Sequence, residues 1–183
     1  AAILRIGGQR QVISTDHLRA FAEDPVLMTR VAAIHALGDI WAMGATPQAA
    51  LATVILPRMA TGMQAAWLEE IMATAQEVFG AEGAEIVGGH SSMGADLTIG
   101  FSVTGLVPGP AVTLIGAQPG DALILTRPIG SGTVLAAEMR GVAKGADVAQ
   151  VWRAMGQSQK VASAHLAPLA RAMTDVTGFG LAG

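Results

Sequence analysis

Cysteine is absent from the 183 residues of this chain. Without it, the sequence holds neither a disulfide framework nor a zinc site built from thiolates. The absence fits a reducing compartment, and the chain does not open with a secretory signal. We therefore expect a cytoplasmic protein.

Positive charge and aromatic side chains are also scarce. The chain has 11 lysines and arginines against 14 aspartates and glutamates, a net charge of -3, and 4% aromatic residues. No basic cluster stands out, whereas nucleic-acid surfaces need clustered lysine and arginine. The composition therefore argues against a nucleic-acid partner.

Long uninterrupted hydrophobic runs are missing too, although 51% of the residues are hydrophobic and the mean hydropathy is +0.48. The uncharged run 97–120 is cut by a Pro-Gly-Pro sequence, and the run 40–57 contains Gly44 and Pro47. Both runs indicate buried strands joined by turns rather than bilayer spans. We expect no membrane association.

Two common phosphate and metal motifs are not found either. The sequence has no G-x-x-x-x-G-K-[ST] loop and no H-E-x-x-H helix, and its only lysines are Lys144 and Lys160. A phosphate-binding site here would have to offset charge with metal ions, arginines and backbone amides. The carboxylates therefore become the residues of interest.

Apolar spacing and turn signals predict alternating strands and helices in the first half of the chain. Asp24 is a plausible N-cap, with Pro25 at the first helical position, for a helix over 23–44. A second helix is expected over 61–80, with Gly80 as its stop. Strands are expected at 10–16, 47–57, 84–91 and 96–110, and the third of these opens into a glycine turn.

A domain boundary is placed near Gly109, in the Pro-Gly-Pro sequence. Beyond it we expect a strand at 121–130, a helix at 131–143 and further helical segments between Asp147 and Met173. Because strands alternate with helices in both halves, the fold class is α/β or α+β. The predicted domains are 1–109 and 110–183.

Three aspartates stand in positions that need an explanation. Asp16 ends a predicted strand, Asp39 lies inside an apolar helix, and Asp175 lies beside glycines. A buried carboxylate is costly unless it is paired, hydrogen-bonded or bound to a metal ion. Each also has a plain structural alternative: a turn or cap for Asp16, a solvent-facing helix side for Asp39, and an N-cap or Asx turn for Asp175.

Two histidines lie close in sequence to these features. His35 shares a helix face with Asp39, and this spacing suits either a metal site or an ordinary hydrogen bond. His90 follows two glycines at a predicted strand end, where exposed backbone amides can approach an anion.

Four motifs occur in order and at domain-scale spacing: STD, HALGDIWAMGATPQAAL, GGHSS and TDVTGFGLAG. In this combination the whole chain resembles the selenophosphate synthetase (selenide, water dikinase) family. That family shares a superfamily with aminoimidazole ribonucleotide synthetase, thiamine monophosphate kinase and a hydrogenase maturation protein. The element DIWAMGATP is typical of the whole superfamily, whereas GGHS and DVTGFGL narrow the resemblance to the one family.

The resemblance implies an enzyme that converts ATP, selenide and water to selenophosphate, phosphate and AMP, with Mg²⁺ as the metal ion. Asp39 would contact metal and nucleotide, Asp175 would bind the metal, and Asp16 would lie at the nucleotide phosphates. Hard carboxylate oxygens suit Mg²⁺, which offsets polyphosphate charge during phosphoryl transfer. Further contacts to ATP would come from Gly89, His90 and Ser91.

The resemblance also implies an aminoimidazole ribonucleotide synthetase-like architecture of two domains. The first domain would pair across a homodimer into a β-barrel, and ATP would lie between the domains. A nucleophilic Cys or selenocysteine and a Lys would precede residue 1, and the second domain would continue past Gly183. We therefore expect an excised core that is inactive alone.

Two departures from the family's pattern leave roles open. The family often has Asn where this chain has His35, and again where this chain has Gln159. Two other functions also remain open from the sequence. One is a sister ATP-using enzyme acting on a ribonucleotide or thiamine monophosphate, and the other is a catalytically silent nucleotide-binding module.

Overall fold

The structure is a computed structural model that describes residues 1–181. These residues form one sheet, one short 3₁₀ turn at Leu114–Gly116 and five α-helices. The strands are β1 (Ala2–Ile6), β2 (Gln9–Arg19), β3 (Thr46–Pro57), β4 (Glu85–Gly94) and β5 (Thr98–Val107). The helices are α1 (Pro25–Ala42), α2 (Thr61–Glu82), α3 (Ser131–Met139), α4 (Gly145–Met155) and α5 (Lys160–Leu166).

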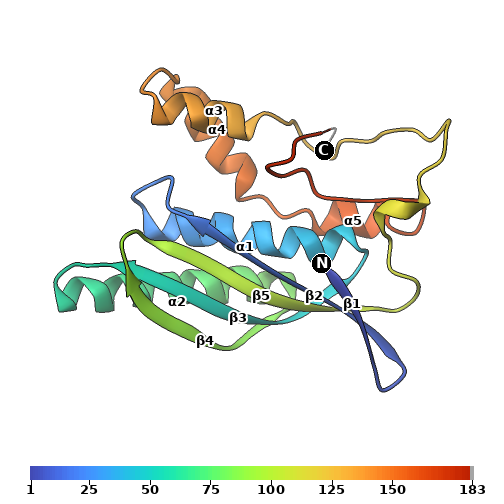
Figure 1. Cartoon of the computed structure of the whole chain (residues 1–183), viewed down its shortest axis with the longest axis horizontal. Helices are drawn as coiled ribbons and strands as arrows, with labels where there is room; N and C mark the ends of the chain where they lie inside the picture. The colour runs from blue at the N-terminus through green and yellow to red at the C-terminus, as the bar shows by residue number, and fades with distance from the viewer. Residues whose placement is uncertain (182–183) are drawn as a thin grey trace.

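The sheet has the strand order β1-β2-β5-β3-β4. Only β3 and β4 run parallel, with α2 as their crossover, and the other neighbours pair antiparallel. β1 and β4 form its two edges, so the sheet is open within residues 1–181 (Figure 1). A single copy of the chain therefore has a mixed α+β fold and does not contain the expected barrel.

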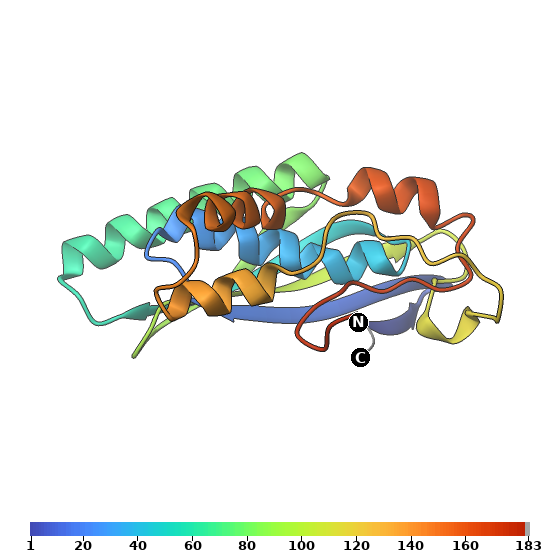
Figure 2. The same ribbon diagram turned by 90° about the horizontal axis from the view of Figure 1, so that it is seen from above.

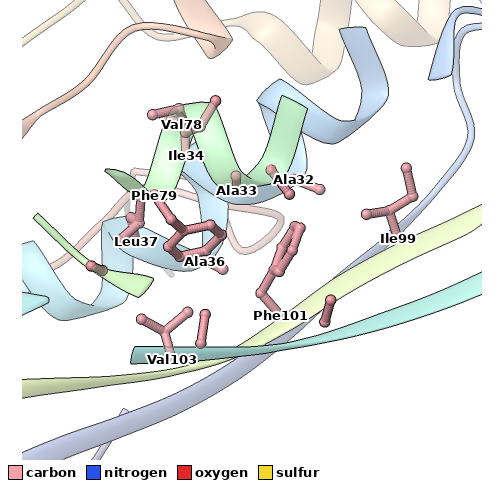
Figure 3. Close-up of a cluster of buried hydrophobic side chains, with 14 of the residues drawn as sticks. Ala32, Ala33, Ile34, Ala36, Leu37, Val78, Phe79, Ile99, Phe101 and Val103 are labelled. Carbon is pink, nitrogen blue, oxygen red and sulfur yellow. The ribbon is translucent and has the colours of Figure 1, made fainter. Parts of the chain in front are cut away.

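One face of the sheet is covered by α1 and α2 (Figure 2). Alternation along β3 places Ala50, Ala52 and Val54 on this covered face, where all three are buried. The same core includes Phe79 of α2 and Phe101 of β5, whose ring centroids lie 4.9 Å apart (Figure 3). Among residues 1–181, no helix packs against the opposite face (Figure 2).

α1 is buried on two sides, because the sheet packs against one side and α4 and α5 contact it as well (Figure 1). Apolar residues therefore occur around most of its circumference rather than along one stripe. Its start is as predicted: the Asp24 side chain accepts hydrogen bonds from the amides of Val26 and Leu27, and Pro25 is the first helical residue.

Several predicted element ends in the first half need correction. β2 continues past Asp16 to Arg19, and α2 passes Gly80 and ends before Gly83, whose φ is +84°. The predicted turn at the GGHS sequence was wrong, since β4 runs through it. Gly89 is needed there for strand packing instead, because a Cβ atom at this position would overlap the carbonyl oxygen of Ala52 on β3.

The second half differs most from prediction. Residues 121–130 form no strand, so the predicted strand was wrong; no strand lies beside this segment to pair with it in the described part of the chain. The helix at 131–143 is confirmed in shorter form as α3, with Gly130 at its N-cap. The helical pattern between 147 and 173 becomes α4 and α5, separated by an irregular segment at 156–159.

No described helix combines the length and the apolar content that a bilayer span requires.

Candidate functional site

The candidate site lies between β2 and α1. Val12 on β2 is buried under α1, so alternation turns Ser14 and Asp16 toward the same helix. α1 places His35 and Asp39 one turn apart on its facing side. Two neighbouring elements thus present four polar side chains to one another.

These side chains are joined in two contacts. Ser14 Oγ donates a hydrogen bond to Asp39 Oδ2, and His35 Nε2 lies 3.9 Å from Asp16 Oδ1. The side chains of Asp39, His35 and Asp16 are 22%, 31% and 34% exposed, and Ser14 is half-buried. The site is therefore partly shielded from water but open on one side.

The carboxylates in this site repel one another. Burial raises the pKa of Asp16, and the charge of Asp39 with a hydrogen bond between the two carboxyl groups raises it further. His35 acts in the opposite direction on this pKa. Burial and the neighbouring Asp39 charge thus both disfavour the ionised form of Asp16.

Asp175 belongs to the same electrostatic cluster. The segment that carries it passes over α1 (Figure 1). Burial raises the pKa of Asp175, the charge of Asp39 raises it further, and Asp16 contributes a smaller effect in the same direction. The structure thus brings Asp16, Asp39 and Asp175 into one region, although they come from three separate segments.

The described residues include no group of three or more histidines and acids close enough together to hold a metal ion by themselves. Mg²⁺ is usually bound by one or two carboxylates, with the remaining positions filled by water and substrate phosphates. Asp39 and Asp175 could supply these two carboxylates. A divalent cation would also offset the repulsion that Asp39 exerts on Asp16 and Asp175.

Gly89, His90 and Ser91 lie elsewhere, on the edge strand β4. His90 pairs with Thr53 of β3, so its side chain is on the uncovered face of the sheet. Asp16 is on the covered face of β2, and the strands β5 and β3 separate β2 from β4. Within one copy of the chain, these three residues are therefore not part of the carboxylate cluster.

Ser14 was not singled out from the sequence, although its hydroxyl is the nearest polar partner of Asp39. The signal was available in the STD motif. Residues two apart on a strand share a face, so Ser14 and Asp16 had to point the same way once the segment was predicted as a strand.

Comparison with curated proteins finds relatives along the whole chain. A selenide, water dikinase from Geobacter metallireducens is 40% identical over 189 residues, covering 100% of this chain and 54% of the relative. Enzymes of the same name from Nitratidesulfovibrio vulgaris and Aeromonas salmonicida are 35% and 37% identical, each with 53% of the relative covered. The chain spans about half the length of the curated relatives it matches.

Solved structures show the same fold at low sequence identity. Thiamine monophosphate kinase from Aquifex aeolicus in complex with AMPPCP and TMP matches with a TM-score of 0.80 at 19% identity, covering 96% of this chain and 59% of that one. The hydrogenase maturation protein HypE in complex with ATP matches with a TM-score of 0.69 at 22% identity, covering 91% and 50%.

Two family models divide the sequence between them. The N-terminal domain of AIR synthase related proteins matches residues 1–107, and the C-terminal domain of the same proteins matches residues 118–183. The first match alone covers more than half of the chain, and the solved structures share its fold. The chain therefore belongs to the AIR synthase related protein family.

Proposed function

We propose that the protein carrying this chain makes selenophosphate from ATP, selenide and water, releasing phosphate and AMP. The observation that carries the proposal is similarity over the entire chain, at 34–40% identity, to proteins named selenide, water dikinase. The partly buried carboxylate cluster adds chemical support, because it suits a metal-bound polyphosphate better than a neutral ligand.

In this proposal Asp39 and Asp175 hold Mg²⁺, which when bound would offset the charge of the ATP phosphates. Asp39 also contacts the nucleotide, and Asp16 lies at its phosphates. Ser14 has one task, which is to fix the Asp39 carboxylate by donating a hydrogen bond to Oδ2. His35 lies beside Asp16 and reduces the repulsion among the acids.

We further propose a homodimer formed through the uncovered face of the sheet. Leu51 is 49% exposed and Val87 62% exposed on β3 and β4, which suits a covered surface better than a free one. A second copy would also explain the position of the edge-strand residues Gly89, His90 and Ser91. These residues are two strands away from the carboxylate cluster of their own copy, so in this proposal they contact an ATP molecule bound at the cluster of another copy.

The proposal keeps the division into an ATP-binding and dimerising domain at 1–109 and a second domain from 110 onward. It places the protein in the cytoplasm, where selenide stays reduced. The attacking Cys or selenocysteine and the accompanying Lys would come from outside this chain, because the chain has no cysteine. Residues 1–183 alone are therefore expected to be inactive.

The test is anaerobic incubation of the protein, as expressed from its own gene, with Mg²⁺, ATP and selenide, followed by phosphorus NMR. A selenophosphate signal that depends on selenide and appears together with AMP is the expected result. ATP that binds and is never turned over would contradict the proposal and favour a silent nucleotide-binding module. Turnover that needs no selenide would instead indicate a sister enzyme.

Dimerisation is tested separately by analytical ultracentrifugation. Leu51→Asp places a charge in the middle of the uncovered face and is expected to give monomers that no longer turn over ATP. Val161→Asp is the matched control, since Val161 is 70% exposed on α5, away from the sheet. A wild-type protein that is monomeric at micromolar concentration and still active would contradict the dimer.

A further inference from the structure

The second half of the chain is fastened to the first at the end of α1. The carbonyl oxygen of Trp41 accepts a 2.7 Å hydrogen bond from Ser163 Oγ on α5, and both residues are buried. Beside it, the carbonyl oxygen of Met43 accepts a 3.1 Å hydrogen bond from the amide of Val112. The last turn of α1 and the residue after it thus hold two separate segments of the second half.

The position of α5 at this junction leaves little free space. A Cβ atom at Gly44 would lie 3.0 Å from the Cβ atom of Ala167, just after α5, and Gly44 has a φ of +67°. A larger residue at Gly44 would push α5 away. The contact therefore fixes α5 closely against the end of α1.

The Ser163 hydroxyl is not needed to satisfy the Trp41 carbonyl. The amide of Gly44 already donates a 2.9 Å hydrogen bond to the same oxygen, as expected at a helix end. The Ser163 bond is additional, and it joins residues 122 positions apart in the sequence. The Ser163 bond therefore connects α5 to α1 and is not required to satisfy a backbone group at the end of α1.

The two proposed metal ligands lie on opposite sides of this connection. Asp39 precedes Trp41 by two residues on α1, and Asp175 follows Ser163 by twelve residues in the chain. Along the way Arg171 is fixed by Nη1, which donates to Asp121 Oδ1 at 2.7 Å and to Gln118 Oε1 at 3.2 Å. The path from Ser163 to Asp175 is thus twelve residues long and is held at Arg171 by these two contacts.

We propose that Ser163 is a positioning residue that sets the separation of the Asp39 and Asp175 carboxylates and thereby the strength with which metal-bound ATP is held. The inference rests on the proposed function only in assigning these two acids to the metal. Removing the hydroxyl would let α5 shift along α1 and move Asp175 relative to Asp39. A displacement of about 1 Å in a positioning group can change a rate by about 100-fold.

The experiment compares Ser163→Ala with wild type in the protein as expressed from its own gene. Affinity for a nonhydrolysable ATP analogue is measured by titration calorimetry with and without Mg²⁺, and bound Mn²⁺ is followed by electron paramagnetic resonance. We expect the gain in affinity due to Mg²⁺ to fall about tenfold or more, with affinity in its absence unchanged. The Mn²⁺ spectrum should broaden, because the ligand geometry becomes less uniform.

Lys160→Met is the matched control, because Lys160 also ties α5 to the first half, but at α2. Its Nζ donates a 3.2 Å hydrogen bond to the carbonyl oxygen of Glu82. This variant should lower the melting temperature and leave the Mg²⁺ effect close to that of wild type. An equal loss in both variants would overturn the proposal, because general loosening of α5 would then explain it.

A second variant keeps the proposal testable if Ser163→Ala does not fold. Arg171→Gln removes the charged contact to Asp121, which is at the surface, and should reduce the Mg²⁺ effect in the same direction by a smaller factor. A normal Mg²⁺ effect in a folded Ser163→Ala protein would overturn the proposal. Failure of the proposed function is distinguishable, since it would remove the selenophosphate signal while leaving these binding measurements intact.

Discussion

Ser14 Oγ on β2 donates a hydrogen bond to Asp39 Oδ2 on α1, across the junction between the sheet and its covering helix. The bond connects residues 25 positions apart and holds one oxygen of a carboxylate that other acids repel. The orientation of Asp39 therefore depends on the sheet as well as on its own helix.

Replacing Ser14 by Ala should weaken Mg²⁺-dependent nucleotide binding by about 10- to 100-fold, because residues that orient a metal ligand typically contribute this much. Titration calorimetry with a nonhydrolysable ATP analogue measures the change. Thr15→Ala is the control, since Thr15 faces the opposite side and bonds to Ser102. Equal effects of both variants would contradict a specific role for Ser14.

Asp39→Asn and Asp175→Asn should each lower selenide-dependent ATP turnover by about 100-fold or more, since a bound metal ion supplies several kcal/mol of charge stabilisation. Phosphorus NMR of the reaction measures the loss. Asp147→Asn, on the exposed first turn of α4, should retain normal turnover. Substantial activity in either of the first two variants would remove that residue from the metal site.

The first half of the chain was predicted well from the sequence because its signals are local. Asp24 and Pro25 define the start of α1, and the apolar spacing that follows them predicts its length. The strand at 121–130 was predicted on the same kind of signal and is not formed. A strand needs a neighbour for its hydrogen bonds, and local sequence carries no information about that neighbour.

The site was predictable as a set of residues but not as an arrangement. Apolar surroundings and glycines singled out Asp16, Asp39 and Asp175, and the structure brings these acids into one region. His90 belongs to the same motif set but lies on the other face of the sheet, beyond two strands. Strand order is a long-range property, so sequence motifs alone could not separate His90 from the acids.

The pH dependence of stability should reflect the raised pKa values of Asp16 and Asp175. A carboxyl group whose pKa is higher in the folded state binds more protons there, so folding stability falls as pH rises from the ordinary aspartate value of about 3.9 through the raised value. Asp16→Asn should therefore raise the melting temperature of the metal-free protein at pH 7.

Below the ordinary aspartate pKa, the Asp16 carboxyl group is protonated in both the folded and the unfolded state. The higher melting temperature of Asp16→Asn relative to wild type should therefore vanish there. Differential scanning calorimetry of wild type and Asp16→Asn across the acidic to neutral range tests the sign. A lower melting temperature for Asp16→Asn at pH 7 without metal would show that Asp16 stabilises the fold, contrary to expectation.

The N-cap of α1 offers a test that is independent of function. Asp24→Ala removes the acceptor for the amides of Val26 and Leu27 and should cost about 1 kcal/mol of unfolding free energy. Asp24→Asn keeps a side-chain acceptor and should cost much less. Urea unfolding followed by circular dichroism distinguishes the two, and equal stabilities would contradict the cap.

The strand order has a consequence for how the protein is made. β2, which carries Ser14 and Asp16, pairs with β5, and Thr15 meets Ser102 across 87 positions of sequence. While the ribosome is still synthesising the chain, β2 therefore has one unpaired edge until residues 98–107 have emerged. For most of the synthesis of residues 1–107, chaperones would therefore meet a nascent chain in which β2, with Ser14 and Asp16, lacks its β5 neighbour and exposes an unpaired strand edge.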